Sequence, residues 1–422
     1  MIGMGVRKYL LFVTLITLSV SVGYWLGEQR VKLAWHGWKP GVVVNKNSIY
    51  PTAQADLDFT LFWKVWDRLG EAYVDKNALD SKKMLDGAIS GMVSALGDPY
   101  TVYLPIPANK EAKEDLGGAF EGVGIQLGFR DSRLAVVTPL EGMPAIKAGV
   151  RSGDYILHIK DVAAGVDRDT DGLSLPEAVK IIRGKRGTVV ELTLHRNGDK
   201  ESFKVNLTRD TIVVKSVTME LLDPSAGSGR VAWVKLTRFG DRTMSEWGEV
   251  VSRITNKEER VTGVVLDLRN NPGGYLEGAV QISGEFLSAG KLVVAQQYGD
   301  GTKQENRVGR NGALLKMPMV VIVNKGSASA SEILAGALQD YKRAKIVGEK
   351  SFGKGSVQQP DDFPDGSGLH VTVAKWLRPN GEWIDKKGIT PDVEVKWEPD
   401  ENASDSADWK SDLQLVKAVE ML

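Results

Sequence analysis

The second half of the chain alternates short apolar runs of strand length with helical patterns, and this alternation constrains the fold more than any other feature. An apolar run at 264–268 precedes a helical pattern after Gly274, and another at 319–323 precedes one that starts at Ala330. Parallel strands need a long crossover connection, usually a helix, so the alternation is typical of a sheet covered by helices. The sequence therefore predicts an α/β core over residues 211–398.

Two different patterns precede this core. Apolar residues first recur at helical spacing, which predicts helices before the turn at Gly97. Short strands separated by glycine-rich turns follow, and one helix near residues 175–182 interrupts them. The expected segments are a helical segment at 57–115, a β-rich module at 116–210, the core at 211–398, and a linker with a short helix at 399–422.

Composition excludes several functional classes. Lys and Arg total 54 and balance 54 Asp and Glu, so the chain lacks the positive field that recruits nucleic acid. The absence of cysteine excludes thiol nucleophiles, disulfides and cysteine-based zinc sites. There is also no His-Glu-x-x-His helix motif. We therefore expect no nucleic-acid partner, no metal and no cofactor.

The N-terminus carries an uncharged stretch, residues 9–26, directly after Arg7 and Lys8. At about 1.5 Å per residue, this stretch nearly spans a hydrocarbon core, and the preceding cations favour a cytoplasmic N-terminus. The sequence therefore predicts a membrane anchor within 1–30, a juxtamembrane linker at 31–56, and a body outside the cytoplasm. The alternative is export after cleavage of a signal peptide, because small residues occur near the end of the apolar stretch.

Ser329 lies between an apolar strand and a helix. A serine at such a turn can project its hydroxyl, while the helix N-terminus offers free N–H groups to developing negative charge. The structural alternative is a capping box, because Ser329 and Glu332 have the spacing at which serine caps a helix and glutamate reaches back to it. From the motif alone, the cap is the favoured interpretation.

A second cluster at 351–356 places Lys354 between two glycines, which gives the lysine an unusually permissive backbone. A surface lysine in a turn is the structural alternative. Of the four histidines, only His370 offers a rival base for Ser329. The alternation in residues 369–373 also suits an ordinary strand position for His370.

Together, Gly-Ser-Ala-Ser-Ala-Ser-Glu-Ile at 326–333 and Phe-Gly-Lys-Gly at 352–355 resemble the signature of the C-terminal processing, or tail-specific, peptidases. Leu-Asp-Leu-Arg-Asn-Asn-Pro-Gly-Gly at 266–274 resembles the glycine turn of that family, and residues 97–101 resemble its N-terminal helical segment. The resemblance covers about residues 58–397. It implies a serine endopeptidase of the Ser-Lys type whose α/β core is of crotonase/Clp-like character.

The resemblance also implies roles for individual residues. Ser329 corresponds to the nucleophile, Lys354 to the general base, and Gln358 to the residue that orients the lysine. The backbone N–H of Ala330 and one N–H from Gly273 or Gly274 would form the oxyanion hole, with the choice of glycine left open. These roles agree with elementary chemistry, because burial favours the neutral amine that a lysine base requires.

The β-rich module resembles a PDZ domain through Glu-Gly-Val-Gly-Ile at 121–125 and the glycine-containing motifs at 143–154. In such domains a loop exposes successive N–H groups to the terminal carboxylate of a peptide, which adds as a strand to the sheet edge. The residues that correspond to this loop are Gly122, Val123, Gly124 and Ile125. The implied partners are protein or peptide substrates with a free C-terminus, with the module binding the tail and gating the site.

Two other functions stay open at this point. A catalytically inactive PDZ scaffold of the cell envelope would keep the domains without the chemistry, although Ser329, Lys354 and Gln358 are intact. A hydrolase of small esters would use Ser329 with His370. The sequence also leaves open a homo-oligomer or an adaptor protein as a partner, and the physiological substrate.

Overall fold

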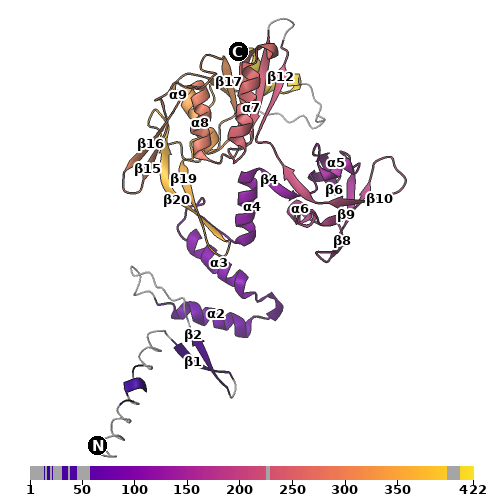
Figure 1. The fold of residues 1–422 in the computed structure, drawn as a ribbon, viewed down its shortest axis with the longest axis vertical. Helices are drawn as coiled ribbons and strands as arrows, with labels where there is room; N and C mark the ends of the chain where they lie inside the picture. The colour runs from indigo at the N-terminus through magenta and orange to yellow at the C-terminus, as the bar shows by residue number, and fades with distance from the viewer. Residues whose placement is uncertain are drawn as a thin grey trace, which may run out of the picture. The chain divides into compact units, whose positions relative to one another are not determined.

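The computed structural model describes Thr14, residues 17–19, Ser21, and residues 31–36, 39–44, 58–224, 229–396 and 409–422. The chain divides into two units, Met1–Met84 and Leu85–Leu422 (Figure 1). No helix within the described segments is long and apolar enough to span a membrane. The anchor predicted at 9–26 lies mostly outside those segments, so it stays a prediction.

The first unit holds a hairpin and a helix. Strands β1 (Val31–His36) and β2 (Lys39–Val44) pair in antiparallel register, with Val31 opposite Val44. The juxtamembrane linker at 31–56 stays a prediction, but these two strands within it were not predicted. They are short and pair only with each other, so they lack the longer pattern that marks a sheet in a sequence. Helix α2 (Thr60–Ala72) follows.

The second unit begins within α3 (Ser81–Ser94) and continues through β3 (Val102–Leu104) and α4 (Ile106–Gly117). A ribbon of β4 (Ala119–Gly122) and β11 (Asp210–Val213) then brackets the β-rich module. The elements of that module are β5 (Ile125–Arg130), β6 (Arg133–Pro139), α5 (Pro144–Lys147), β7 (Tyr155–Asp161), β8 (Val166–Asp169), α6 (Leu175–Ile182), β9 (Val189–His195) and β10 (Phe203–Thr208).

The module is an antiparallel sheet in the order β10-β9-β7-β6-β5, with β8 paired to β7. Strand β5 is at the edge, so its outer N–H and C=O groups are open to another strand. Alternate residues of the strands point into one core, which α6 covers with Ala178 and Ile182. The predicted short strands and the helix near residues 175–182 are confirmed, and the structure adds the short helix α5, which was not predicted.

The α/β core contains a sheet of order β12-β13-β14-β17-β18-β21, parallel except for the edge strand β12. A second, antiparallel sheet has the order β16-β15-β20-β19, and β3 adds to β20. The strands are β12 (Val217–Leu222), β13 (Arg230–Leu236), β14 (Val261–Asp267), β15 (Leu292–Tyr298), β16 (Lys303–Arg307), β17 (Met319–Val323), β18 (Lys345–Gly348), β19 (Ser356–Asp362), β20 (Gly368–Leu377) and β21 (Val393–Glu394).

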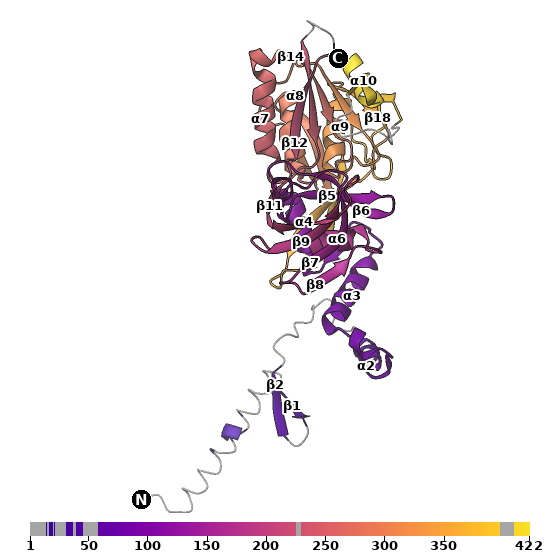
Figure 2. The same cartoon turned by 90° about the vertical axis from the view of Figure 1, so that its right-hand side faces the viewer.

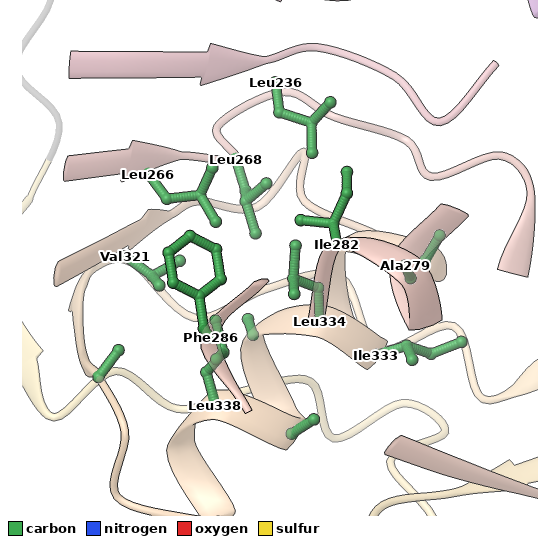
Figure 3. Packing of buried hydrophobic residues seen from close by; sticks show 14 of the residues in the cluster. Leu236, Leu266, Leu268, Ala279, Ile282, Phe286, Val321, Ile333, Leu334 and Leu338 are labelled. Carbon is green, nitrogen blue, oxygen red and sulfur yellow. The ribbon is translucent and has the colours of Figure 1, made fainter. Parts of the chain in front are cut away.

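Helices cover both faces of the parallel sheet. On one face α7 (Thr243–Thr255), α8 (Leu276–Phe286) and α9 (Ala330–Asp340) pack in a single apolar cluster with alternate residues of the strands. Figure 3 shows Phe286 and Leu334 meeting the sheet in this cluster. On the other face α10 (Leu413–Glu420) covers a smaller cluster (Figure 2). The predicted α/β core is confirmed, and its loops at the carboxyl ends of β14 and β17 carry the candidate site.

Candidate active site

Ser329 occupies the turn between β17 and α9, as predicted. Its backbone has φ 56° and ψ −116°, a conformation with positive φ that is strained for any residue with a Cβ atom. Such strain at a strand-to-helix turn is typical of a nucleophile whose hydroxyl must project from the fold. Ser329 is half-buried and lines a cavity of about 240 Å³.

The neighbouring serines have structural roles instead. The Ser327 hydroxyl donates to the carbonyl oxygen of Leu268 at 2.7 Å, and the Ser331 hydroxyl donates to that of Asn271 at 2.9 Å. Both serines are fully buried. The geometry therefore distinguishes Ser329 from the two serines that flank it in the motif.

The glycine turn approaches Ser329 closely. A Cβ atom on Gly273 would lie 2.8 Å from the Cβ of Ser329 and 3.0 Å from the nitrogen of Ala330. A Cβ atom on Gly274 would overlap the carbonyl oxygen of Phe239. Both glycines also have positive φ, at 104° and 131°. Only glycine can therefore hold the main chain this close to the serine.

The two glycines differ in the use of their N–H groups. The Gly273 N–H donates to Oδ1 of Asn271 at 2.9 Å, and the buried Asn271 amide is itself fixed by the carbonyl of Leu236. The Gly274 N–H has no acceptor among the described residues. Ala330 is the first residue of α9, so its N–H has no acceptor within the helix. Gly274 and Ala330 thus offer N–H groups beside Ser329.

Lys354 lies in the loop before β19 and lines the same cavity as Ser329. Its carbonyl oxygen accepts a hydrogen bond from Nε1 of Trp376 at 2.7 Å, and the carbonyl of Gly355 accepts one from Nε1 of Trp383. These indoles fix the backbone that follows the lysine side chain. Burial lowers the pKa of the Lys354 ammonium below its ordinary value, although the carboxylates of Asp98 and Glu332 oppose that shift.

Glu332 joins the serine turn to the lysine loop. Its buried carboxylate accepts hydrogen bonds from the N–H of Ser329 (2.9 Å), the hydroxyl of Ser351 (2.5 Å), and the N–H groups of Gly353 (2.6 Å) and Lys354 (3.0 Å). Burial raises the pKa of this carboxyl, and the same hydrogen bonds oppose the shift. The capping contact predicted from the sequence is present, but it is one part of a larger junction.

Gln358 also lines the cavity, on β19. Its Nε2 donates to the hydroxyls of Ser356 at 2.9 Å and Thr372 at 3.1 Å. No hydrogen bond joins the side chains of Ser329, Lys354 and Gln358 in the part of the chain that the structure describes. The structure therefore brings the three predicted residues to one cavity and leaves the contact between Gln358 and Lys354 unmade.

His370 reaches the same cavity from β20. Burial lowers the pKa of its imidazole, and the nearby Lys354 lowers it further, while Asp362 raises it. His370 is thus closer to the site than an ordinary outward-facing strand residue would be. Lys350 lies in the same loop as Lys354, between β18 and β19, and it is exposed.

In the β-rich module, the loop predicted to bind a carboxylate connects β4 to the edge strand β5. The carbonyls of Val123 and Gly124 accept from the N–H groups of Ala145 and Leu140. The N–H groups of Val123 and Gly124 have no acceptor among the described residues. Gly122 is paired within the β4–β11 ribbon, and Ile125 begins β5. Two of the predicted residues therefore present unused donors.

Sequence reasoning missed three contributors to the cavity and its frame: Glu332 as a junction, Asn271 as an anchor of the glycine turn, and Trp376 as a clamp on the lysine loop. The capping-box spacing marked Glu332, but its partners lie up to 22 residues away. Within the described segments, no group of three or more acidic or histidine side chains is placed to hold a metal.

Three family models match parts of this chain. Residues 230–395 match the model of peptidase family S41, residues 122–207 match a PDZ domain, and residues 42–106 match the N-terminal domain of the activating protease CtpB. A solved structure of the S41 protease class from Bacteroides fragilis aligns over 84% of this chain and 95% of that chain, with a TM-score of 0.53. It is 15% identical, so this likeness concerns the fold alone.

Two curated relatives come from Bacillus subtilis (strain 168). The carboxy-terminal processing protease CtpA is 37% identical over 81% of this chain and 70% of its own length. The carboxy-terminal processing protease CtpB is 36% identical over 83% of this chain and 71% of its own length. At this identity and coverage, the chain belongs to the carboxy-terminal processing proteases of peptidase family S41.

Proposed function

We propose that this serine-type endopeptidase cleaves protein substrates near their C-terminus, with Ser329 as nucleophile and Lys354 as general base. The observation that carries the proposal is that Ser329 and Lys354 line one cavity. The buried carboxylate of Glu332 accepts hydrogen bonds from the backbone N–H groups of both residues. A scaffold without activity would not need a strained serine beside a desolvated lysine.

The reaction follows acyl-transfer chemistry. The neutral Lys354 amine takes the proton of the Ser329 hydroxyl as the oxygen attacks the peptide carbonyl. The resulting ammonium gives that proton to the departing amine when the C–N bond breaks, which leaves an acyl-enzyme ester. Water then attacks the ester while Lys354 accepts a proton from it. The ammonium returns this proton to the serine oxygen as the ester C–O bond breaks, which releases the acid product and restores Ser329.

The oxyanion of each tetrahedral intermediate would accept hydrogen bonds from the N–H groups of Ala330 and Gly274. Gly274 is favoured over Gly273, because the Gly273 N–H already donates to Asn271. Gly274 also lines the cavity with Ser329. Fixed donors of this kind stabilise developing charge more than water does.

Exchange of Ser329 for alanine tests the nucleophile. Ser329→Ala should abolish cleavage of an unfolded protein, measured by mass spectrometry of the products. Ser327→Ala and Ser331→Ala are matched controls, and each should keep much of the activity while losing about 1 kcal/mol of stability with its buried hydrogen bond. Full activity of a folded Ser329→Ala variant would exclude the assignment.

The pH dependence tests the base. Because burial lowers the pKa of Lys354, kcat/KM should rise with pH and level off below the ordinary lysine pKa of about 10.4. Lys354→Arg keeps the charge permanently, so it should lose at least about 100-fold in kcat at every pH. Near-normal rates in Lys354→Arg would show that another group removes the proton.

His370 also lines the cavity. This position supports the alternative function, a hydrolase of small esters that uses Ser329 and His370. Activity that survives His370→Ala and is lost in Lys354→Ala would reject this alternative. The opposite pattern would establish it.

The PDZ domain would bind the substrate tail. The free N–H groups of Val123 and Gly124 suit a terminal carboxylate, and the edge strand β5 suits an added peptide strand. Such binding tethers the substrate near Ser329, and it would also gate the site if the unliganded domain obstructs the groove.

Amidation of the substrate tail tests this binding. A peptide with apolar terminal residues and a free C-terminus should be cleaved faster than its amide, because amidation removes the charge that the loop favours. Equal rates would remove the tail-sensing role. Deletion of residues 116–210, with folding verified, separates the mechanisms: tethering alone predicts a weak peptidase, whereas gating predicts faster cleavage of unfolded proteins.

The proposed location of the body is outside the cytoplasm, anchored by residues 9–26. Support comes from the cations before that stretch and its uncharged composition. The protein should remain with membranes after a high-salt wash and dissolve only in detergent, because screening does not weaken hydrophobic burial. Recovery of a soluble chain that begins near Tyr24 would indicate a cleaved signal peptide.

A further inference from the structure

The segment from Gly97 to Thr101 contacts Lys354, one of the residues that line the cavity, although the chemistry above gives the segment no role. The ring of Tyr100 has its centroid 5.0 Å from Nζ of Lys354. The Thr101 hydroxyl accepts the N–H of Thr372 on β20 at 3.0 Å. This segment therefore contacts both the lysine and the strand beside Gln358.

Asp98 organises the segment through its carboxylate. It accepts hydrogen bonds from the N–H of Tyr100 at 3.0 Å and from the hydroxyl of Thr101 at 2.7 Å. Burial raises the pKa of Asp98, but hydrogen bonds from the side chains of Thr372 and Thr101 and from backbone N–H groups outweigh burial and lower it. The Thr372 hydroxyl is thus a partner of the Asp98 carboxylate. The same hydroxyl accepts the Gln358 amide at 3.1 Å.

The direction of these hydrogen bonds fixes the Gln358 amide. An ionised carboxylate only accepts, so the Thr372 proton must point to Asp98 and its lone pair is left for an N–H donor. Gln358 meets Ser356 and Thr372 with its two amide N–H groups. Its carbonyl oxygen, Oε1, is consequently turned away from both hydroxyls, and it has no donor among the described residues.

We propose that Asp98 and Thr372 are positioning residues that hold the Gln358 amide in the one orientation in which Oε1 can accept a hydrogen bond from Nζ of Lys354. This inference rests on the proposed function of Lys354 as the base. With the amide reversed, Gln358 would present N–H groups to the Lys354 amine. It could then not accept a hydrogen bond from Nζ, and the lone pair of Nζ would not be directed toward Ser329.

Asp98 also acts on the lysine through its charge. The ionisable groups around Lys354 are Asp98 and Tyr100 from this segment, Glu332 from α9, His370 from β20, and Asp385 from the loop that contacts Gly355. The Asp98 carboxylate favours the ammonium, so its removal should lower the pKa of Lys354. Thr372 carries no charge, and its replacement should leave that pKa in place.

The test is a comparison of Thr372→Val, Thr372→Ser and Asp98→Asn across pH with a quenched fluorescent peptide that has a free apolar C-terminus. Thr372→Val should reduce the plateau of kcat by at least about tenfold, with KM and the midpoint of the pH profile unchanged. Thr372→Ser keeps the hydroxyl and should retain wild-type kcat. Asp98→Asn should reduce the plateau and move the rising limb to lower pH.

Thr218→Val is the matched control, because Thr218 is an exposed strand residue of the same core. Wild-type kcat in Thr372→Val, or an equal loss in Thr372→Ser, would overturn the proposal. A pH-profile midpoint that is unchanged or raised in a folded Asp98→Asn variant would also overturn the proposal. If Asp98→Asn does not fold, the comparison of Thr372→Val with Thr372→Ser decides. Ser329→Ala and Lys354→Ala run in parallel, since their full activity would reject the proposed function itself.

Discussion

The buried carboxylate of Glu332 is the interaction on which the candidate site depends. It accepts hydrogen bonds from the serine turn at the start of α9 and from the loop that carries Lys354. A buried carboxylate is costly unless several donors satisfy it, so the loss of either loop would leave an unpaired charge in the core. The turn that carries Ser329 and the loop that carries Lys354 are therefore stable only together, because Glu332 holds each in place relative to the other.

The remaining parts of the site close around this junction from separate elements. The glycine turn after β14 approaches Ser329 with main-chain atoms alone, and Asn271 fixes that turn. Two indoles, Trp376 and Trp383, hold the carbonyls of Lys354 and the glycine that follows it. If the lysine were mobile, its side chain would extend into solvent, where water stabilises the charged ammonium form. Immobilising its backbone beside apolar walls keeps the amine in the environment that lowers its pKa.

The sequence predicted the α/β core and the β-rich module because both follow from local periodicity. It also identified Ser329, Lys354 and Gln358 through motifs, and the structure brings these residues to one cavity. The hairpin at β1 and β2 was missed, since two short strands that pair only with each other leave little pattern.

Contacts between residues that are far apart in the sequence could not be predicted from local patterns. Thr101 meets Thr372 across 271 positions, and no local rule pairs them. Glu332 has the spacing of a helix cap, and that local role concealed its contact with Ser351 and the lysine loop. The preference for Gly274 over Gly273 depends on the hydrogen bond that the Gly273 N–H donates to Asn271, and this bond depends on a turn conformation.

The junction is tested most directly by the turnover of Glu332→Gln on an unfolded protein, with Glu277→Gln on the exposed first turn of α8 as its matched control. The amide would direct N–H groups at other N–H donors, at a cost of about 1–3 kcal/mol. If Glu332 holds the two loops in register, the folded variant should lose at least about 100-fold in kcat while the control keeps its rate. A folded Glu332→Gln with wild-type turnover would contradict the dependence of the site on this carboxylate.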